Sequence, residues 1–113
     1  MIRNKTKAYE SEKSINLIKL VGFNLKKYRM RKGYSQTRVA EKLSLFLTEG
    51  KSKFEFTFQQ IQKYEKGINK TNGIVLYALS KILDCSMHSF FIKEEYDYPN
   101  AMKNGEVEKV IIG

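Results

Sequence analysis

The chain has 113 residues, of which 42% are apolar, and its formal net charge is +9. This length and composition suit one domain with a packed interior rather than two domains or a disordered chain. The apolar runs are too short to span a bilayer, the N-terminus lacks the apolar middle of a signal peptide, and the single cysteine allows no internal disulfide. These features predict a cytoplasmic protein.

The positive charge is concentrated in residues 1–92, which hold 18 Lys and Arg against 7 Asp and Glu, a net +11. Residues 93–113 hold 3 against 5, a net −2. A body this basic favours polyanions, nucleic acid first and anionic membrane second. A lysine-rich surface that only keeps the protein soluble would have the same composition, so charge alone does not decide the function.

Residues 1–13 are expected to form a basic N-terminal arm, and an amphipathic helix is predicted over residues 14–32. Ser14 is its expected N-cap, and Gly33 is expected to end it. The apolar stripe has the three- and four-residue spacing of one helix face. Its members are Ile18, Val21, Leu25 and Tyr28.

A second helix is expected to begin after the N-cap Ser35 and to extend through Leu47. Its inward face consists of Val39, Ala40, Leu43 and Leu47. Residues 48–56 interrupt the helical pattern, with Glu49–Gly50 as a turn and KFEFTF as a short extended piece.

Thr57 is expected to cap a third, short helix (57–66), which ends at Gly67. A fourth helix is predicted to turn Ile74, Leu76, Leu79 and Leu83 inward. A short fifth helix, capped by Ser86, adds Met87, Phe90 and Phe91 to the core. The predicted fold class is all-α, with five helices packed obliquely around one core and a C-terminal extension over residues 93–113.

The third helix is polar over most of its surface, although Ile61 and Tyr64 share an inward face. Glutamine offers a donor and an acceptor that match adenine N7 and N6, lysine suits guanine O6 and N7, and a phenyl ring can contact a thymine methyl. Taken alone, the same residues could be an ordinary solvated face. The predicted base-contacting residues are Phe58, Gln59, Gln62 and Lys63.

GYSQTRVAEKL followed by TFQQIQKYEKG resembles the helix-turn-helix domain of the phage repressor/Cro type, the XRE-like family. The matching marks are Gly33, Ser35–Gln36, Val39–Ala40, Leu43, Thr57, Ile61, Tyr64–Glu65 and Gly67. LYALSKILDCSMHSFF is similar to the closing helices of the family, and the resemblance covers residues 18–92 of a predicted domain over residues 14–92. The resemblance implies that helix 57–66 enters the major groove of double-stranded DNA.

The resemblance also assigns residues to the DNA backbone. Gln36, at the start of the second helix, would hydrogen-bond a phosphate, and the two helix N-termini could present N–H groups to phosphates as well. Phe58, Gln59 and Lys63 fall on the base-contacting positions of the family. The residues expected to face the backbone after the third helix are Lys66, Asn69 and Lys70.

Two features depart from the family. Between Leu43 and Thr57 the chain has 13 residues where about two are expected, so a longer second helix and a protruding loop or hairpin at 48–56 must absorb the excess. Lys51 and Lys53 in this insertion are expected to touch the DNA backbone, although the insertion could bind a protein or simply be tolerated. Many relatives carry a glutamine at Phe58, which bonds the equivalent of Gln36; phenylalanine cannot make this bond.

The favoured function is a sequence-specific DNA-binding transcriptional regulator that acts as a homodimer on a palindromic site. The apolar VEKVIIG near the C-terminus is the candidate pairing element. The alternative is a protein-interaction module on a repressor-like fold, such as an antitoxin or a polymerase partner, which would use the insertion or the acidic tail. Attachment of the basic helix 14–32 to acidic membrane is a third possibility, but the protein core explains its apolar stripe better.

No enzyme activity, cofactor or metal is expected. Cys85 and His88 have a Cys-x-x-His spacing, but zinc needs three or four ligands and the chain has one residue of each type. Cys85 is therefore expected to be a small buried residue. Neither a glycine-rich phosphate loop nor a set of nucleophilic and acid–base residues is evident. Glu65 is expected to connect its helix to a loop through a salt bridge.

Overall fold

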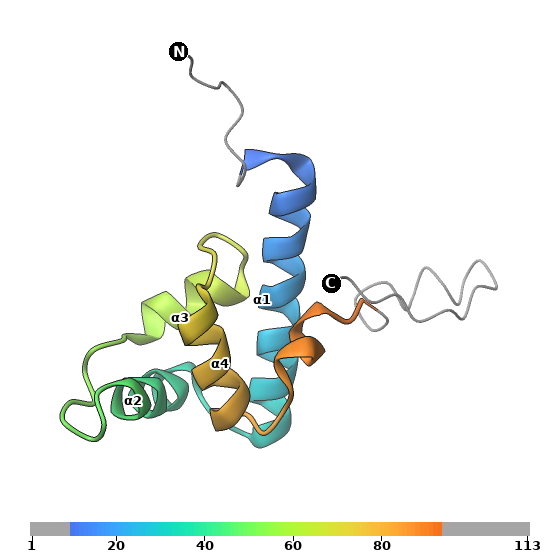
Figure 1. Cartoon of the computed structure of the whole chain (residues 1–113). Helices are drawn as coiled ribbons and strands as arrows, with labels where there is room; N and C mark the ends of the chain where they lie inside the picture. The colour runs from blue at the N-terminus through green and yellow to red at the C-terminus, as the bar shows by residue number, and fades with distance from the viewer. Residues whose placement is uncertain (1–9, 94–113) are drawn as a thin grey trace, which may run out of the picture.

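The computed structural model describes residues 10–93, which fold into four α-helices and one 3-10 helix (Figure 1). The elements are α1 (Glu12–Lys32), α2 (Gln36–Leu47), α3 (Phe58–Glu65), α4 (Gly73–Ile82) and the 3-10 helix η2 (Met87–Phe91). The all-α class is confirmed for this part of the chain, but the prediction of five α-helices is wrong. Ser86 caps η2 as expected, but the backbone is already extended at Ile92. The hydrogen bonds of this short segment join residues three apart, which is the pattern of a 3-10 helix and not of an α-helix.

The helix boundaries follow local capping. The Ser35 side chain accepts the N–H of Arg38 at 3.0 Å, and Gly33 ends α1 in the left-handed region at φ 74°. Gln60 Oε1 accepts the N–H of Thr57 at 2.9 Å, as in a capping box. Asn72 caps α4 as Ser35 caps α2, because its Oδ1 accepts the N–H of Val75 at 2.8 Å. The predictions for the cap residues of α2 and α3 are thus confirmed.

The start of α1 differs from its prediction. The Ser11 hydroxyl accepts the N–H of Ser14 at 3.2 Å, so the helix begins at Glu12 and Ser14 lies inside its first turn. Ser14 was a plausible cap because both serines precede the apolar stripe, and the sequence pattern does not choose between them. The helix therefore extends into the predicted arm. The rest of that arm, residues 1–9, and the C-terminal residues 94–113 lie outside the described residues, and so does the candidate pairing element.

The core lies between the five elements, which pack against one another in pairs (Figure 1). α3 packs against both α1 and α2, α4 packs against α2, and η2 packs against α1. The buried apolar residues are Leu20, Val21, Leu25, Val39, Ala40, Leu43, Ile61, Val75, Leu76, Ala78, Leu79, Leu83 and Phe90. None of the helices within residues 10–93 is long and apolar enough to cross a membrane.

Some predicted core positions are wrong. Ile74 is 68% exposed and Met87 is 36% exposed, because α4 turns the adjacent Val75 toward the core and η2 buries Phe90 instead. Both errors occur in short helices, where several registers of apolar residues are compatible with the sequence. The tertiary neighbours decide which register is buried.

Asn24 fixes η2 to α1. Its side chain is fully buried, and its Nδ2 donates to the carbonyl oxygens of Phe90 at 2.9 Å and Ile92 at 3.0 Å. The Oδ1 atom accepts no hydrogen bond from any described residue. A buried amide with two backbone partners and no exposure stabilises one specific position of the segment after α4.

We expect Asn24→Ala to lower the free energy of unfolding by about 2 kcal/mol, because two carbonyl groups lose a donor and a cavity opens. The matched control is Asn16→Ala on the exposed side of the same helix, which should change stability by less than about 0.5 kcal/mol. Urea unfolding midpoints at an unchanged m-value measure both variants. Equal effects of the two substitutions would contradict the role given to Asn24.

Candidate nucleic-acid interface

α3 has two different sides. Ile61 is fully buried, and Tyr64 packs partly against the core. On the remaining surface Phe58 is 45% exposed, Gln59 and Lys63 are exposed, and Gln62 is half-buried. These exposures include the effect of the insertion, so the 48–56 loop leaves this side of α3 open. All four predicted base-contacting residues lie on α3 and are accessible to solvent.

An ion pair holds the C-terminal end of α3. Glu65 receives two bonds from the Arg29 guanidinium, from Nε to Oε2 at 2.5 Å and from Nη2 to Oε1 at 3.0 Å. Arg29 Nη1 also donates to the Tyr34 carbonyl at 2.8 Å. Only 3% of the Glu65 side chain and 12% of the Arg29 side chain are exposed. Glu65 therefore connects α3 to α1. The predicted salt bridge of Glu65 is confirmed, but its partner Arg29 belongs to α1 and not to a loop.

Gln36 joins the same network. Its Nε2 donates to Glu65 Oε1 at 3.0 Å, which links α2 to α3. An amide nitrogen has two N–H groups, so one remains for the predicted phosphate contact. In the family that the sequence resembles, a glutamine at the position of Phe58 bonds the equivalent of Gln36. Here the carboxylate of Glu65, at the other end of α3, accepts the bond from Gln36 instead. The side chain is half-buried and positioned before any ligand binds.

Two glycines let α1 and α3 approach closely. A Cβ on Gly22 would come within 2.7 Å of the Glu65 carbonyl oxygen and would also overlap the carbonyl of Tyr64. Gly67 has φ 72° and faces Lys19, with 2.7 Å between the side chain and an added Cβ. The absence of side chains at these positions therefore sets the distance between the two helices. The sequence analysis did not predict a packing role for Gly22.

We expect Gly22→Ala to destabilise the protein by about 1–3 kcal/mol, because backbone atoms must move to accept the methyl group. Alanine in an open helix position normally stabilises, so the sign itself tests the contact. Gly73→Ala is the matched control, since nothing lies within 4 Å of its added Cβ, and it should be neutral or stabilising by up to about 1 kcal/mol. Thermal unfolding of the two variants checks the difference. A stable Gly22→Ala variant would disprove the close approach.

The loop between α3 and α4 carries the second group of predicted contacts. Lys66, Asn69 and Lys70 are all exposed. The N–H of Ile68 donates to the Lys63 carbonyl at 2.9 Å, which folds the loop back on the last turn of α3. The residues predicted to contact the DNA backbone therefore lie directly beside the C-terminal end of α3.

The insertion is an ordered loop rather than a hairpin, and no strand occurs between α2 and α3. The predicted turn at Glu49–Gly50 is confirmed, with both residues at positive φ, but KFEFTF does not form an extended piece. The reason is that the C-cap residue of α2, Thr48, holds the start of the loop. Thr48 Oγ1 donates to the Ser52 carbonyl and accepts the Ser52 N–H, both at 3.0 Å.

The end of the insertion is fixed in the same way. The buried Ser44 hydroxyl accepts the N–H of Phe56 at 2.8 Å and donates to the Ala40 carbonyl. The Phe56 ring packs partly against the core. Between these two anchors Phe54 is 75% exposed, and the Lys53 ammonium lies 5.5 Å from the centre of its ring. Lys51 is also exposed, so both predicted lysines are presented on a braced loop.

No group of three or more His, Cys, Asp or Glu side chains within residues 10–93 could hold a metal ion. Cys85 is half-buried rather than fully buried. Burial raises the pKa of its thiol to about 11, with a smaller contribution from Asp84. A thiol with this pKa is protonated at neutral pH, which is unfavourable for nucleophilic chemistry.

No family model matches the chain. Over 83 residues it is 36% identical to an uncharacterised HTH-type transcriptional regulator of Sinorhizobium medicae (strain WSM419), and equally identical to one of Rhizobium meliloti (strain 1021). The match covers 73% of this chain and 52% of each relative, so the chain spans about half the length of the curated relatives it matches. This similarity, together with the α2–α3 arrangement, supports a helix-turn-helix domain.

Proposed function

We propose that this protein is a sequence-specific DNA-binding transcriptional regulator of the phage repressor/Cro type, which docks α3 in the major groove. The observation that carries the proposal is the two-sidedness of α3. Ile61 is buried, while Gln59 and Lys63 lie one turn apart on the open side. The two rhizobial relatives, which are named as HTH-type transcriptional regulators, add support. The proposed base contacts are Phe58, Gln59, Gln62 and Lys63.

Phosphate contacts are proposed around both ends of α3. Gln36 would hold the backbone with its second N–H, and the remaining contacts come from the insertion and from the α3–α4 loop. Positive charge at these positions fits the basic character of residues 1–92. The proposed phosphate-contacting residues are Gln36, Lys51, Lys53, Lys66, Asn69 and Lys70.

Selection of bound duplexes from a random pool tests this function. Recovered sequences should share a short motif, because base-edge contacts distinguish base pairs. The four lysines among the proposed phosphate contacts should give a log–log slope of affinity against salt of about −3.6, from about −0.9 per neutralised phosphate. Recovery of random sequences, or a slope close to zero, would refute specific DNA binding.

A single module makes few base contacts, so we propose a homodimer with half-sites about 34–36 Å apart. Residues 93–113 are the proposed pairing element because VEKVIIG is apolar and follows the helical domain. Chain truncated to residues 1–96 is expected to sediment as a monomer, whereas the full chain sediments as a dimer. A truncated chain that still sediments as a dimer would place the interface elsewhere.

A second candidate function is protein interaction through the insertion. The observation in its favour is Phe54, a large ring that is 75% exposed on a braced loop. A partner such as a toxin or a polymerase subunit could bury this ring. Phe54→Ala would then abolish partner binding and leave duplex binding intact, whereas the reverse result would favour a DNA contact.

A further inference from the structure

The connection between α2 and α3 is too long to orient the proposed recognition helix by itself. It runs over residues 48–57, whereas a turn of a few residues would restrict the angle between the two helices. α3 has eight residues, which make about two turns, so it offers few side chains for packing. Its direction therefore depends on specific attachments to the neighbouring helices.

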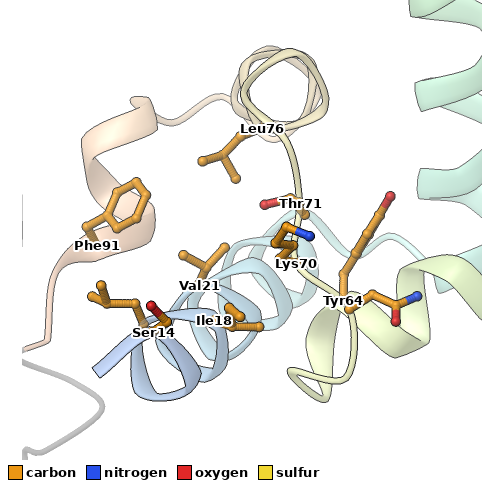
Figure 2. A pocket seen from close by; sticks show the side chains of 10 residues that line it. Ser14, Ile18, Val21, Tyr64, Lys70, Thr71, Leu76 and Phe91 are labelled. Carbon is orange, nitrogen blue, oxygen red and sulfur yellow. The ribbon is translucent and has the colours of Figure 1, made fainter. Parts of the chain in front are cut away.

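The C-terminal end of α3 is attached to α1 through the ion pair of Glu65 with Arg29. On the same side, Tyr64 borders an apolar hollow of about 180 Å³, and Figure 2 shows Ile18 and Val21 of α1 on the wall of this hollow. A hollow leaves a helix with fewer packing contacts than a close-packed interior does. Attachment at this end alone would therefore let α3 swing about its last turn.

Ser44 attaches the other end. Its side chain is fully buried in α2. The Oγ atom accepts the N–H of Phe56 at 2.8 Å and donates to the carbonyl of Ala40 at 2.8 Å. A hydroxyl has a single proton, which the Ala40 bond uses, so the lone pairs of the oxygen remain for the Phe56 N–H. The bond thus joins the interior of α2 to the residue that precedes the N-cap of α3.

A continuous path leads from this bond to the first turn of α3. The Phe56 ring packs partly against the core, and the next residue is the N-cap Thr57, whose N–H donates to Gln60 Oε1 at 2.9 Å. A capping box of this kind fixes the first turn of a helix to its N-cap. Holding Phe56 therefore holds the turn that carries Phe58 and Gln59, two of the proposed base contacts.

We propose that Ser44 positions α3 for base recognition, an inference that rests on the proposed function. Ser44 touches no DNA in this proposal and acts through the backbone of Phe56. Recognition side chains must be held within about 0.5 Å of their working geometry. Without the Ser44 bond the first turn of α3 is free to move, and Phe58 and Gln59 then meet the base edges in several orientations.

The loss of this bond should affect base recognition more than attachment to the DNA backbone. Phosphate contacts carry no sequence information. Four of the proposed phosphate contacts are lysines, whose long and flexible side chains adjust to a small movement of the helix. Removal of the Ser44 hydroxyl should therefore weaken binding to a selected duplex more than binding to a scrambled one.

Ser44→Ala in the full chain tests the positioning role. The variant should bind a selected duplex about fivefold more weakly and a scrambled duplex less than about twofold more weakly, as measured by fluorescence anisotropy. The expected effect is modest because the base contacts are loosened and their side chains are still present. An unchanged ratio of the two affinities would overturn the proposal.

Ser80→Ala is the matched control for a general loss of stability. Ser80 is 4% exposed, and its hydroxyl donates to the Tyr77 carbonyl of the same helix, α4, at 2.6 Å. The control therefore also deletes a buried hydroxyl that bonds within its own helix, but it leaves the attachment of α3 intact. Its ratio of affinities should equal that of the unaltered chain. An equal drop in this ratio for both variants would overturn the positioning role.

Amide hydrogen exchange followed by NMR tests the attachment without DNA. The Phe56 N–H should exchange at least about tenfold faster in Ser44→Ala than in the unaltered chain, because it loses its acceptor. The N–H of Val75, which bonds the Asn72 side chain, should exchange at the same rate in both chains. An unchanged exchange rate at Phe56 would overturn the attachment and with it the proposal.

Selection of bound duplexes distinguishes failure of this proposal from failure of the proposed function. If the unaltered chain selects no sequence, the proposed function fails, and the positioning role fails with it. If the chain selects a sequence and Ser44→Ala keeps the ratio of affinities, only the positioning role fails. Faster exchange at Phe56 together with a lower ratio supports both.

Discussion

Glu65→Ala is expected to lower the free energy of unfolding by about 3–5 kcal/mol, because it leaves the nearly buried Arg29 guanidinium without its partner. The same change removes the acceptor for Gln36 and so disconnects α2 from α3. Small domains have about 5–15 kcal/mol in total, so the variant should approach the limit of stability. Urea unfolding followed by helical circular dichroism measures the change.

Two controls separate the buried pair from a general loss of charge. Glu55→Ala removes an exposed carboxylate from the insertion and should change stability by less than about 0.5 kcal/mol. Arg29→Met combined with Glu65→Met removes both charges and keeps the side-chain volume, so it should be less damaging than Glu65→Ala alone. A Glu65→Ala variant that loses less than about 1 kcal/mol would show that the pair does not hold α3.

The double variant Gln59→Ala with Lys63→Ala should bind a selected duplex about 2–4 kcal/mol more weakly than the unaltered chain. Each substitution removes one potential base-edge contact, and such contacts discriminate by about 1–3 kcal/mol each. Both residues are exposed, so the fold should be retained. Fluorescence anisotropy with the selected duplex and a scrambled duplex measures the affinity and the loss of discrimination.

The matched control is Asn16→Ala with Lys81→Ala, which removes one amide and one lysine from exposed positions outside α3. This control should weaken duplex binding only by the loss of one positive charge. It should leave the ratio of the affinities for the selected and the scrambled duplex unchanged. If both double variants weakened the two duplexes equally, binding would depend on net charge alone, and α3 would not read base edges.

The parts of the fold that depend on local rules could be predicted from the sequence. The cap at Ser35, the start of α3 after Thr57 and the left-handed Gly33 each depend on a few neighbouring residues. The position of Ile61 on the inward side of α3 follows from the same short range. For this reason the exposed set on α3 was predictable as a group.

The features that fix helix positions depend on distant residues and could not be predicted in this way. The partner of Glu65 lies on α1, and Gly22 matters only because a carbonyl of α3 lies against it. Asn24 looks like a polar position on a helix until η2 packs over it. A signal was present in the glycine within an otherwise helical pattern, since such a residue often marks close packing.

The anchoring of the insertion has a consequence for how proteins of this architecture diversify. Its ends are held by hydroxyl groups of Ser44 and Thr48, whereas the tip bears Lys53 and Phe54. Substitutions at the tip therefore leave these bonds, and with them the fold of the domain, in place. New preferences can be acquired at this point by exchanging a handful of amino acids, much as antibody loops vary on a constant framework.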